Sequence, residues 1–157
     1  MCSVIILRRP GHVWPVILGA NRDEMADRPW KAPDRHWPDR PEVVAGLDVL
    51  AGGSWFGIND HGVLACTLGP APDKRSRGEL VLEALEHADA TDAARALAAV
   101  EPSSYRAFNL LIADSRDAFW IANREEEGTV TMESVPEGVS MLTAYDLNDR
   151  KGSARVA

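Results

Sequence analysis

The chain has 157 residues, of which 45% are hydrophobic and 26% are charged, and its formal net charge is −7. A chain of this length can bury a core of its own, and the acidic balance argues against nucleic acid or an anionic membrane as a partner. The sequence contains no apolar stretch of the roughly 18 to 20 residues that a membrane-spanning helix needs, and no signal-peptide layout at its N-terminus. We therefore predict a single cytoplasmic domain over residues 1–157, with no membrane span.

The N-terminal part of the chain predicts paired strands followed by a loop. Residues 3–7 and 16–20 are short and rich in β-forming side chains, and the Pro10-Gly11 break between them indicates a turn. Between residues 28 and 41 the chain carries four prolines, which argue against a helix or a central strand. We expect an irregular loop there, held to the core by tryptophans.

The middle of the chain predicts a hairpin and then two helices. Residues 50–67 have the pattern of strand, tight turn and strand, with Asn59-Asp60-His61-Gly62 as the turn. The segment Ser76-Arg77-Gly78-Glu79 has capping-box spacing and precedes an apolar run, which predicts a helix that begins near Ser76. A second helix is expected over about residues 91–100, because Pro102 ends it.

Short strands return after the helices, and the order of the elements predicts the fold class. The β-rich segments are residues 109–113, 118–122, 129–132 and 139–143. Strands and helices do not alternate one by one, as they would in a doubly wound parallel sheet. The sequence therefore predicts an α+β fold or a layered αββα arrangement.

Cys2 is the residue whose position points most directly to chemistry. Methionine removal is efficient before a small residue, so processing would leave Cys2 with a thiol and a free α-amine. Their reference pKa values, near ~8.5 and ~7.7–8.0, allow the amine to take the thiol proton and the thiolate to attack an amide or ester carbonyl. A retained Met1 would block this chemistry, and a cysteine at position 2 can also occur without any function.

A compact charged cluster, Asn21-Arg22-Asp23-Glu24, follows the second predicted strand. Opposite charges at the end of one strand can be held beside the end of a neighbouring strand, where they could position a nucleophile. An ordinary charged turn has the same local pattern, so the cluster taken alone leaves both explanations open.

Asn59 is a candidate oxyanion donor. Its side-chain amide could hydrogen-bond to the negative charge that develops on oxygen during acyl transfer. Its place in a tight turn offers a simpler explanation, since asparagine and glycine often satisfy turn geometry. Both explanations stay open at this point.

Several spaced motifs together resemble the NRDE family, also called the transport and Golgi organisation protein 2 family. The motifs are, in chain order, Cys2, the strand that ends in Asn21-Arg22-Asp23-Glu24, Arg28-Pro29, and residues 51–57, 77–80 and 108–111. They extend over most of the chain in the order seen in the family, which is more specific than any single motif. The family takes its name from the tetrapeptide.

This resemblance implies a fold and a site. The family is similar to N-terminal-nucleophile (Ntn) cysteine hydrolases, such as bile-salt hydrolases and penicillin acylases, whose fold is an αββα sandwich. By that likeness Cys2 matches the nucleophile, the charged groups near it fall within residues 21–24, and Asn59 resembles the oxyanion asparagine. The likeness does not decide which residue of the tetrapeptide takes which role.

The sequence departs from the hydrolase pattern near its C-terminal end. Where those enzymes carry a further asparagine late in the chain, residues 142–146 place Ala144, so an oxyanion hole built in their way would lack one donor. Family members also generally extend past a point equivalent to Ala157. We therefore expect the sandwich to be incomplete at the C-terminus.

Two further features suggest ligands. The basic segment 74–77 precedes a predicted helix start, where the helix dipole favours anions such as a phosphate-bearing acyl carrier, although a solvated basic turn has the same pattern. The five tryptophans could line an apolar pocket or anchor loops to the core.

The histidines show no metal-ligand spacing, so we expect no metal and no cofactor.

Two functional hypotheses follow. The first is an Ntn-like cysteine amidohydrolase or acyltransferase for a small amide, ester or thioester, in which Cys2 attacks while Arg22, Asp23 and Asn59 orient and stabilise. The second is a non-catalytic binding or trafficking protein for a lipid-related or haem-like ligand on the same scaffold, as the family's association with secretion, lipid balance and haem movement implies. Cys2 would then contact the ligand without turnover.

Overall fold

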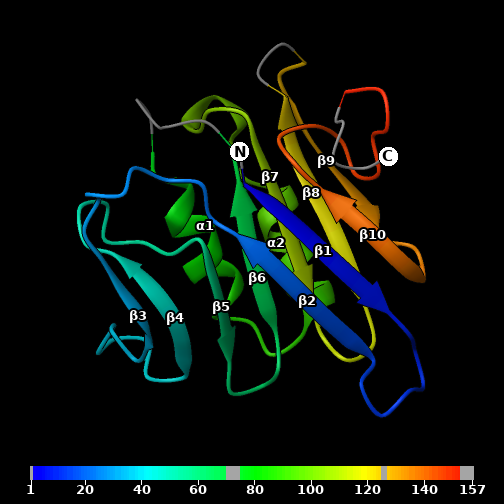
Figure 1. Cartoon of the computed structure of the whole chain (residues 1–157), viewed down its shortest axis with the longest axis horizontal. Helices are drawn as coiled ribbons and strands as arrows, with labels where there is room; N and C mark the ends of the chain where they lie inside the picture. The colour runs from blue at the N-terminus through cyan, green and yellow to red at the C-terminus, as the bar shows by residue number, and fades with distance from the viewer. Residues whose placement is uncertain (1, 70–74, 125–126, 153–157) are drawn as a thin grey trace.

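The computed structural model describes residues 2–69, 75–124 and 127–152, and Figure 1 shows their arrangement. Within these residues the elements follow one another as strands, helices and strands. The strands are β1 (Ser3–Arg8), β2 (Val16–Asn21), β3 (Trp30–Asp34), β4 (Val43–Asp48), β5 (Phe56–Asn59), β6 (Leu64–Leu68), β7 (Phe108–Ala113), β8 (Ala118–Arg124), β9 (Thr129–Ser134) and β10 (Gly138–Leu142). The helices are α1 (Arg77–Ala84), α2 (Ala90–Ala98) and a short 3₁₀ helix, Pro102–Ser104.

The strands form two antiparallel sheets. A three-stranded sheet has the order β10-β1-β2, with Val4 opposite Leu142 on one side and Ala20 on the other. The remaining strands form a seven-stranded sheet in the order β3-β4-β5-β6-β7-β8-β9. Neighbours in the larger sheet are consecutive in the chain, and the helices lie in the connection between β6 and β7.

The two sheets pack face to face, and the helices cover the other side of the larger sheet (Figure 1). Strand β7, beside the middle strand β6, has the sequence FNLLIA, and all of its residues are buried. Leu110 and Ile112 belong to the core beneath the helices, whereas Leu111 and Ala113 belong to the core between the sheets. A strand with two covered faces requires such a continuous apolar run rather than alternation.

The α+β class is confirmed, and the layers run in the order helices, large sheet, small sheet. Among the described residues no helix covers the outer face of the small sheet, where the exposed fractions of Ile5, Ile17 and Val139 are 49%, 48% and 70%. The described residues therefore do not establish the fourth layer of an αββα sandwich.

Two strands of the larger sheet differ from the prediction. The loop expected between residues 28 and 41 is wrong in part, because Trp30–Asp34 forms the edge strand β3. Pro33 is tolerated there because an edge strand leaves one side unpaired, and the register against β4 shifts between Lys31 and Asp34. The sequence analysis also misses β4, whose burial is spread over both faces and therefore gives no alternating pattern.

Both helices begin close to their predicted starts. Ser76 is the N-cap of α1, and its hydroxyl accepts a hydrogen bond from the backbone N–H of Gly78. Asp89 caps α2, which covers Ala90–Ala98 where residues 91–100 were expected. In the part of the chain that the structure describes, neither these helices nor any other is long and apolar enough to cross a membrane.

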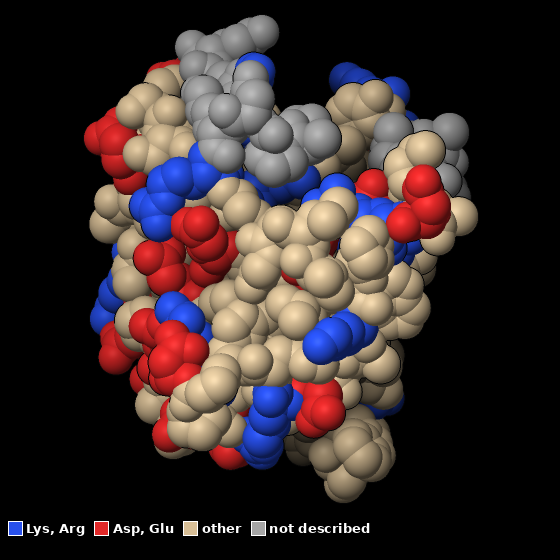
Figure 2. Space-filling view, turned by 90° about the vertical axis from the view of Figure 1, so that its left-hand side faces the viewer, with Lys and Arg blue, Asp and Glu red and all other residues tan. Residues whose placement is uncertain are grey.

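The charges on the face that Figure 2 shows are mixed. Basic and acidic side chains lie beside one another there, rather than in separate fields of one sign. Ion pairs on the surface, such as Arg35 with Asp60 and Arg40 with Glu86, have the same character.

Candidate functional site

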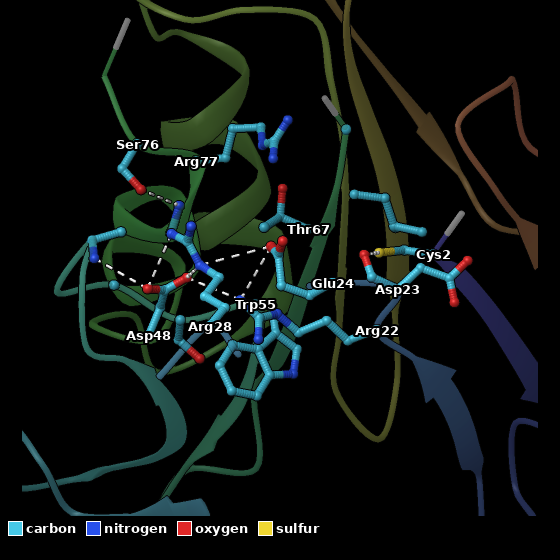
Figure 3. Close-up of a pocket in the computed structure, with 16 residues that line it drawn as sticks. Cys2, Arg22, Asp23, Glu24, Arg28, Asp48, Trp55, Thr67, Ser76 and Arg77 are labelled. Atoms are coloured by element: carbon cyan, nitrogen blue, oxygen red, sulfur yellow. Dashed lines mark hydrogen bonds and ion pairs between the residues drawn. The ribbon is translucent and has the colours of Figure 1, made fainter. Parts of the chain in front are cut away.

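A pocket of about 250 Å3 opens where several strand ends meet the start of α1 (Figure 3). Its walls come from the residue before β1, the turn after β2, the β4–β5 connection, the end of β6 and the first turn of α1. Four of the six predicted site residues line it: Cys2, Arg22, Asp23 and Glu24. The fold thus assembles most of the predicted site from segments that are distant in the sequence.

Cys2 lies at the pocket directly before β1. Because Ser3 pairs with Asn21, the register of β1 and β2 brings Cys2 beside the residues that follow β2. The half-buried thiol donates a weak hydrogen bond to the backbone carbonyl oxygen of Asp23, with a sulfur-to-oxygen distance of 3.9 Å. The predicted nucleophile and the charged tetrapeptide therefore meet in the fold.

Arg22 is held in place by two kinds of contact. Its guanidinium group donates to the carboxylate of Asp48 at 2.9 Å and lies 3.4 Å from that of Glu24. The centre of the same group lies 4.2 Å from the centroid of the Trp55 ring, which is a cation–π distance. Arg22 is consequently fixed on one wall of the pocket (Figure 3).

Asp48, at the end of β4, organises that wall. Its carboxylate accepts hydrogen bonds from Arg22 and Arg28 and from the backbone N–H groups of Leu50 and Ala51. Burial has the largest single effect and raises the pKa of Asp48, but the bonds from Arg28 and Ala51 together leave that pKa below its ordinary value. Asp48 is not among the predicted site residues, and its only signal in the sequence is a carboxylate placed just before a glycine-rich turn.

Of the other residues of the tetrapeptide, Glu24 lines the pocket and Asn21 does not. Asn21 does not line the pocket, and its side-chain amide donates to the carboxylate of Asp23 at 3.1 Å. Glu24 lines the pocket and approaches the guanidinium group of Arg28 at 3.7 Å. Asn21 therefore lies behind Asp23 and helps to orient it.

Close contact between Gly53 and Gly78 brings the motifs at residues 51–57 and 77–80 together at one wall of the pocket. A Cβ atom on Gly53 would lie 2.7 Å from the carbonyl carbon of Gly78, so only glycine fits this approach of backbone to backbone. Beside it, the N–H of Ser54 donates to the carbonyl oxygen of Gly78 at 3.2 Å. This contact places the first turn of α1 at the pocket.

Arg77 reaches into the pocket from that first turn. Burial lowers the pKa of its guanidinium group, whereas the Cys2 thiolate and the Glu24 carboxylate act in the opposite direction. Its Nε and Nη1 atoms are buried and have no hydrogen-bond partner among the described residues. Sequence reasoning singled out the basic segment 74–77, of which residue 74 lies outside the described residues.

Asn59 does not line this pocket, and its side-chain amide is engaged elsewhere. Its Nδ2 group donates both protons, to the carbonyl oxygens of Leu85 and His87 at 2.9 and 2.7 Å. Its Oδ1 atom accepts from the N–H groups of His61 and Val63. The side chain is buried at the far end of β5 from the pocket and has no proton left for an oxyanion. The simpler explanation, turn geometry, accounts for it.

Asn109 is a buried polar residue that sequence reasoning used only as part of a motif. Its amide nitrogen donates to the carbonyl oxygens of Thr143 and Tyr145, both at 2.9 Å, and so holds the backbone on either side of Ala144. β10 ends at Leu142, which pairs with Val4, and the chain bends over residues 143–146. Asn109 therefore fixes the bend that follows β10.

The tryptophans do not form one common binding surface. Trp55 lines the pocket, and Trp30 meets it edge to face with ring centroids 6.1 Å apart. Trp120 lies in the core between the sheets, and Trp37 packs against the core beneath the helices. Within the described residues, no group of three or more His, Cys, Asp or Glu side chains is placed to hold a metal ion.

The fold and the pocket define a class of protein, an α+β protein with a cysteine thiol at a pocket walled by paired arginine and carboxylate groups. Residues 1–152 match the family described as Transport and Golgi organisation 2, and the chain therefore belongs to this family. The identity of this chain to the Transport and Golgi organization 2 homolog of Mus musculus is 37% over 126 residues, covering 73% of this chain and 45% of the mouse protein.

Two further relatives agree. The Bos taurus homolog is 38% identical over 127 residues, with the same two coverages, 73% and 45%. The Homo sapiens homolog is 33% identical over 157 residues, covering 89% of this chain and 56% of the human protein. The chain thus spans about half the length of the curated relatives that it matches.

Proposed function

We propose that this chain carries the nucleophile and one wall of the active site of an Ntn-like cysteine amidohydrolase or acyltransferase. Its substrate would be a small amide, ester or thioester. The observation that carries the proposal is the Cys2 thiol, which lines a pocket and contacts the backbone of Asp23. The chain spans about half the length of its curated relatives, so any activity of the whole protein is likewise a proposal.

The reaction needs a free α-amine on Cys2, which removal of Met1 would supply. The amine takes the thiol proton, and the thiolate sulfur bonds to the carbonyl carbon of the substrate. The carbon-to-leaving-group bond then breaks, the amine, alcohol or thiol of the substrate leaves with that proton, and a thioester on Cys2 stays behind. Water or an acceptor amine attacks this thioester in the second step and regenerates the thiol.

The arginine and carboxylate groups around Cys2 would serve this reaction by fixing geometry. Arg22 is held between Asp48 and Trp55, so the backbone that follows it, including the carbonyl of Asp23, is held as well. Such preorganisation matters because a misplacement of the reacting groups by about 1 Å can cost roughly 100-fold in rate. Asp23 and Arg22 are in this proposal positioning residues.

The test is the intact mass of the purified protein before and after treatment with iodoacetamide, followed by peptide mapping. Loss of the Met1 mass together with one adduct on Cys2 is expected. The Cys2→Ala variant should lose both the adduct and the hydrolysis of 4-nitrophenyl butyrate while its Tm stays nearly unchanged. A retained Met1, or a Cys2 that does not react, would remove the basis of the catalytic proposal.

A second function, binding and transport of a lipid-related ligand, is favoured by a different observation. Exposed apolar side chains neighbour residues that line the pocket: Met25 follows Glu24, Trp30 contacts Trp55, and Leu50 hydrogen-bonds to Asp48 through its backbone. Their exposed fractions are 72%, 56% and 67%. Such an apolar rim suits an amphipathic ligand. Tight binding of a fatty acyl chain without any Cys2-dependent turnover would favour this function over catalysis.

A further inference from the structure

Three arginines and three carboxylates line the pocket, and the arginines differ in how they are paired. Arg22 and Arg28 both pair with Asp48 and both approach Glu24, so two cations face two carboxylates. Arg77 has no such partner in the described part of the chain: its side chain forms no ion pair there, and its Nε and Nη1 atoms donate to no acceptor. Figure 3 draws no dashed line to it.

A buried arginine without a paired carboxylate lowers the stability of the folded protein. Burial of a charged group without a partner disfavours the charged form, and burial is the largest effect on the pKa of Arg77, which it lowers. An apolar side chain of similar length would fill the same space without that cost. An unsatisfied buried group of this kind calls for an explanation, and an anion that arrives from outside would provide it.

The guanidinium group of Arg77 packs beside the end of β6. Its Nη1 atom lies against Gly69 at the end of β6, where an added Cβ atom would come within 2.6 Å of it. Gly69, Arg77 and Cys2 all line the same pocket. The cation and the thiol therefore face one space, and the thiolate of Cys2 acts on the pKa of Arg77 across it.

We infer that Arg77 binds an anionic group, a carboxylate or a phosphate, on the molecule that enters this pocket. The substrate class of the proposed enzyme is then an amide, ester or thioester that carries a negative charge close to its scissile carbonyl. The substrate class rests on the proposed function, whereas the anion contact at Arg77 does not. An ion pair with hydrogen bonds from a guanidinium group typically changes affinity by roughly 10- to 100-fold.

The first experiment measures binding in the Cys2→Ala background, where turnover is absent. Tm and Kd are measured with sodium glutarate, sodium phosphate and sodium chloride at equal ionic strength, because chloride controls for screening. Glutarate or phosphate should raise the Tm, and Arg77→Met should weaken its binding by roughly 10- to 100-fold. The larger shift of the two identifies the anion as carboxylate or phosphate.

Matched variants separate recognition from a structural role. Arg75→Met removes a cation two residues away that is exposed and paired with Glu79 at 2.7 Å, and it should leave anion binding unchanged. Without any anion, Arg77→Met should melt at the same temperature as the parent or higher, because it removes an unpaired buried charge. A marked fall in Tm, an equal anion effect in Arg77→Met, or no anion effect in the parent would each overturn the inference.

The second experiment distinguishes failure of this inference from failure of the proposed function. It compares kcat/KM for 4-nitrophenyl butyrate and for mono-4-nitrophenyl glutarate, which adds a terminal carboxylate. We expect a preference for the charged ester that Arg77→Met abolishes and Arg77→Lys partly restores. Turnover that is Cys2-dependent but without this preference contradicts the role of Arg77 alone, whereas anion binding without Cys2-dependent turnover contradicts catalysis alone.

Discussion

The backbone of Gly53 lies against the backbone of Gly78, and this contact closes the wall between the β4–β5 connection and α1. A Cβ atom on Gly78 would come within 2.9 Å of the Ser54 nitrogen and 3.0 Å of the Gly53 Cα atom. Neither neighbour is the end of a flexible side chain, so the backbone itself must shift. The pocket therefore depends on two residues that carry no functional group.

Gly78→Ala is accordingly expected to destabilise the protein by about 1–3 kcal/mol, the usual cost of overpacking. Chemical denaturation followed by fluorescence measures this loss. Gly19→Ala in β2 is the matched control, because an added Cβ there meets nothing within 4 Å, and its stability should change by less than about 0.5 kcal/mol. Equal effects of the two substitutions would show that the Gly53 and Gly78 backbones can move apart freely.

Asp48→Asn should both destabilise the protein and change its response to acid. The substitution leaves Arg22 and Arg28 without their carboxylate, and we expect a loss of about 2–4 kcal/mol at pH 7. The folded-state pKa of Asp48 lies below the unfolded value of about 3.9, so its stabilisation is complete above about pH 5 and disappears as the pH falls through the folded pKa.

Denaturant melts of Asp48→Asn between pH 7 and pH 2 test this coupling. The stability of the wild type should fall more steeply below pH 5 than that of the variant. Asp60→Asn is a control, since Asp60 forms an exposed pair with Arg35 and such pairs contribute little. Parallel curves for wild type and Asp48→Asn would exclude Asp48 as a source of the acid response.

Asn59→Ala should impair folding and leave the chemistry of the pocket intact. The change leaves the carbonyl oxygens of Leu85 and His87 and the N–H of Val63 without their partner, at an expected cost of about 2–4 kcal/mol. Under conditions where the variant is folded, the alkylation rate of Cys2 should equal that of the wild type. A loss of turnover with unchanged stability would instead restore Asn59 as an oxyanion donor.

The two cysteines should differ sharply in reactivity. Burial raises the pKa of Cys66 to about 12, so only roughly one Cys66 side chain in 10,000 is a thiolate at pH 8, and the sulfur is also inaccessible. Iodoacetamide should label Cys2 in the folded protein and label Cys66 only after unfolding, as read by peptide mass. Rapid labelling of Cys66 in the folded state would mean that the core between the sheets opens readily.

Asn109→Ala should loosen the bend that follows β10. Without the bonds to the Thr143 and Tyr145 carbonyls, the backbone around Ala144 loses its anchor, while Trp120 and Arg124 lose an acceptor. Hydrogen exchange should accelerate in β10 and in residues 143–146 and stay slow in α2. Uniform acceleration throughout the chain would indicate global destabilisation rather than a local clamp.

Local sequence patterns predicted the secondary-structure elements whose signal lies within a single segment. The paired strands β1 and β2, the capped start of α1 at Ser76 and the continuous apolar run of β7 follow from the residues themselves. Local pattern failed at β3 and β4, because an edge strand with a proline and a strand buried on both faces lack alternation. It left two explanations open at Asn59, because a turn and an oxyanion donor require the same residue type.

The sequence by itself determined the α+β class, the family through its spaced motifs, and the candidacy of Cys2 with its charged tetrapeptide. Only the tertiary structure decided which groups meet. It brought Asp48 from β4 to Arg22, placed Arg77 in the same pocket, and moved Asn59 to the far end of β5. The reason is physical: distances between side chains on different strands depend on sheet register and layer packing, which no local pattern of residues records.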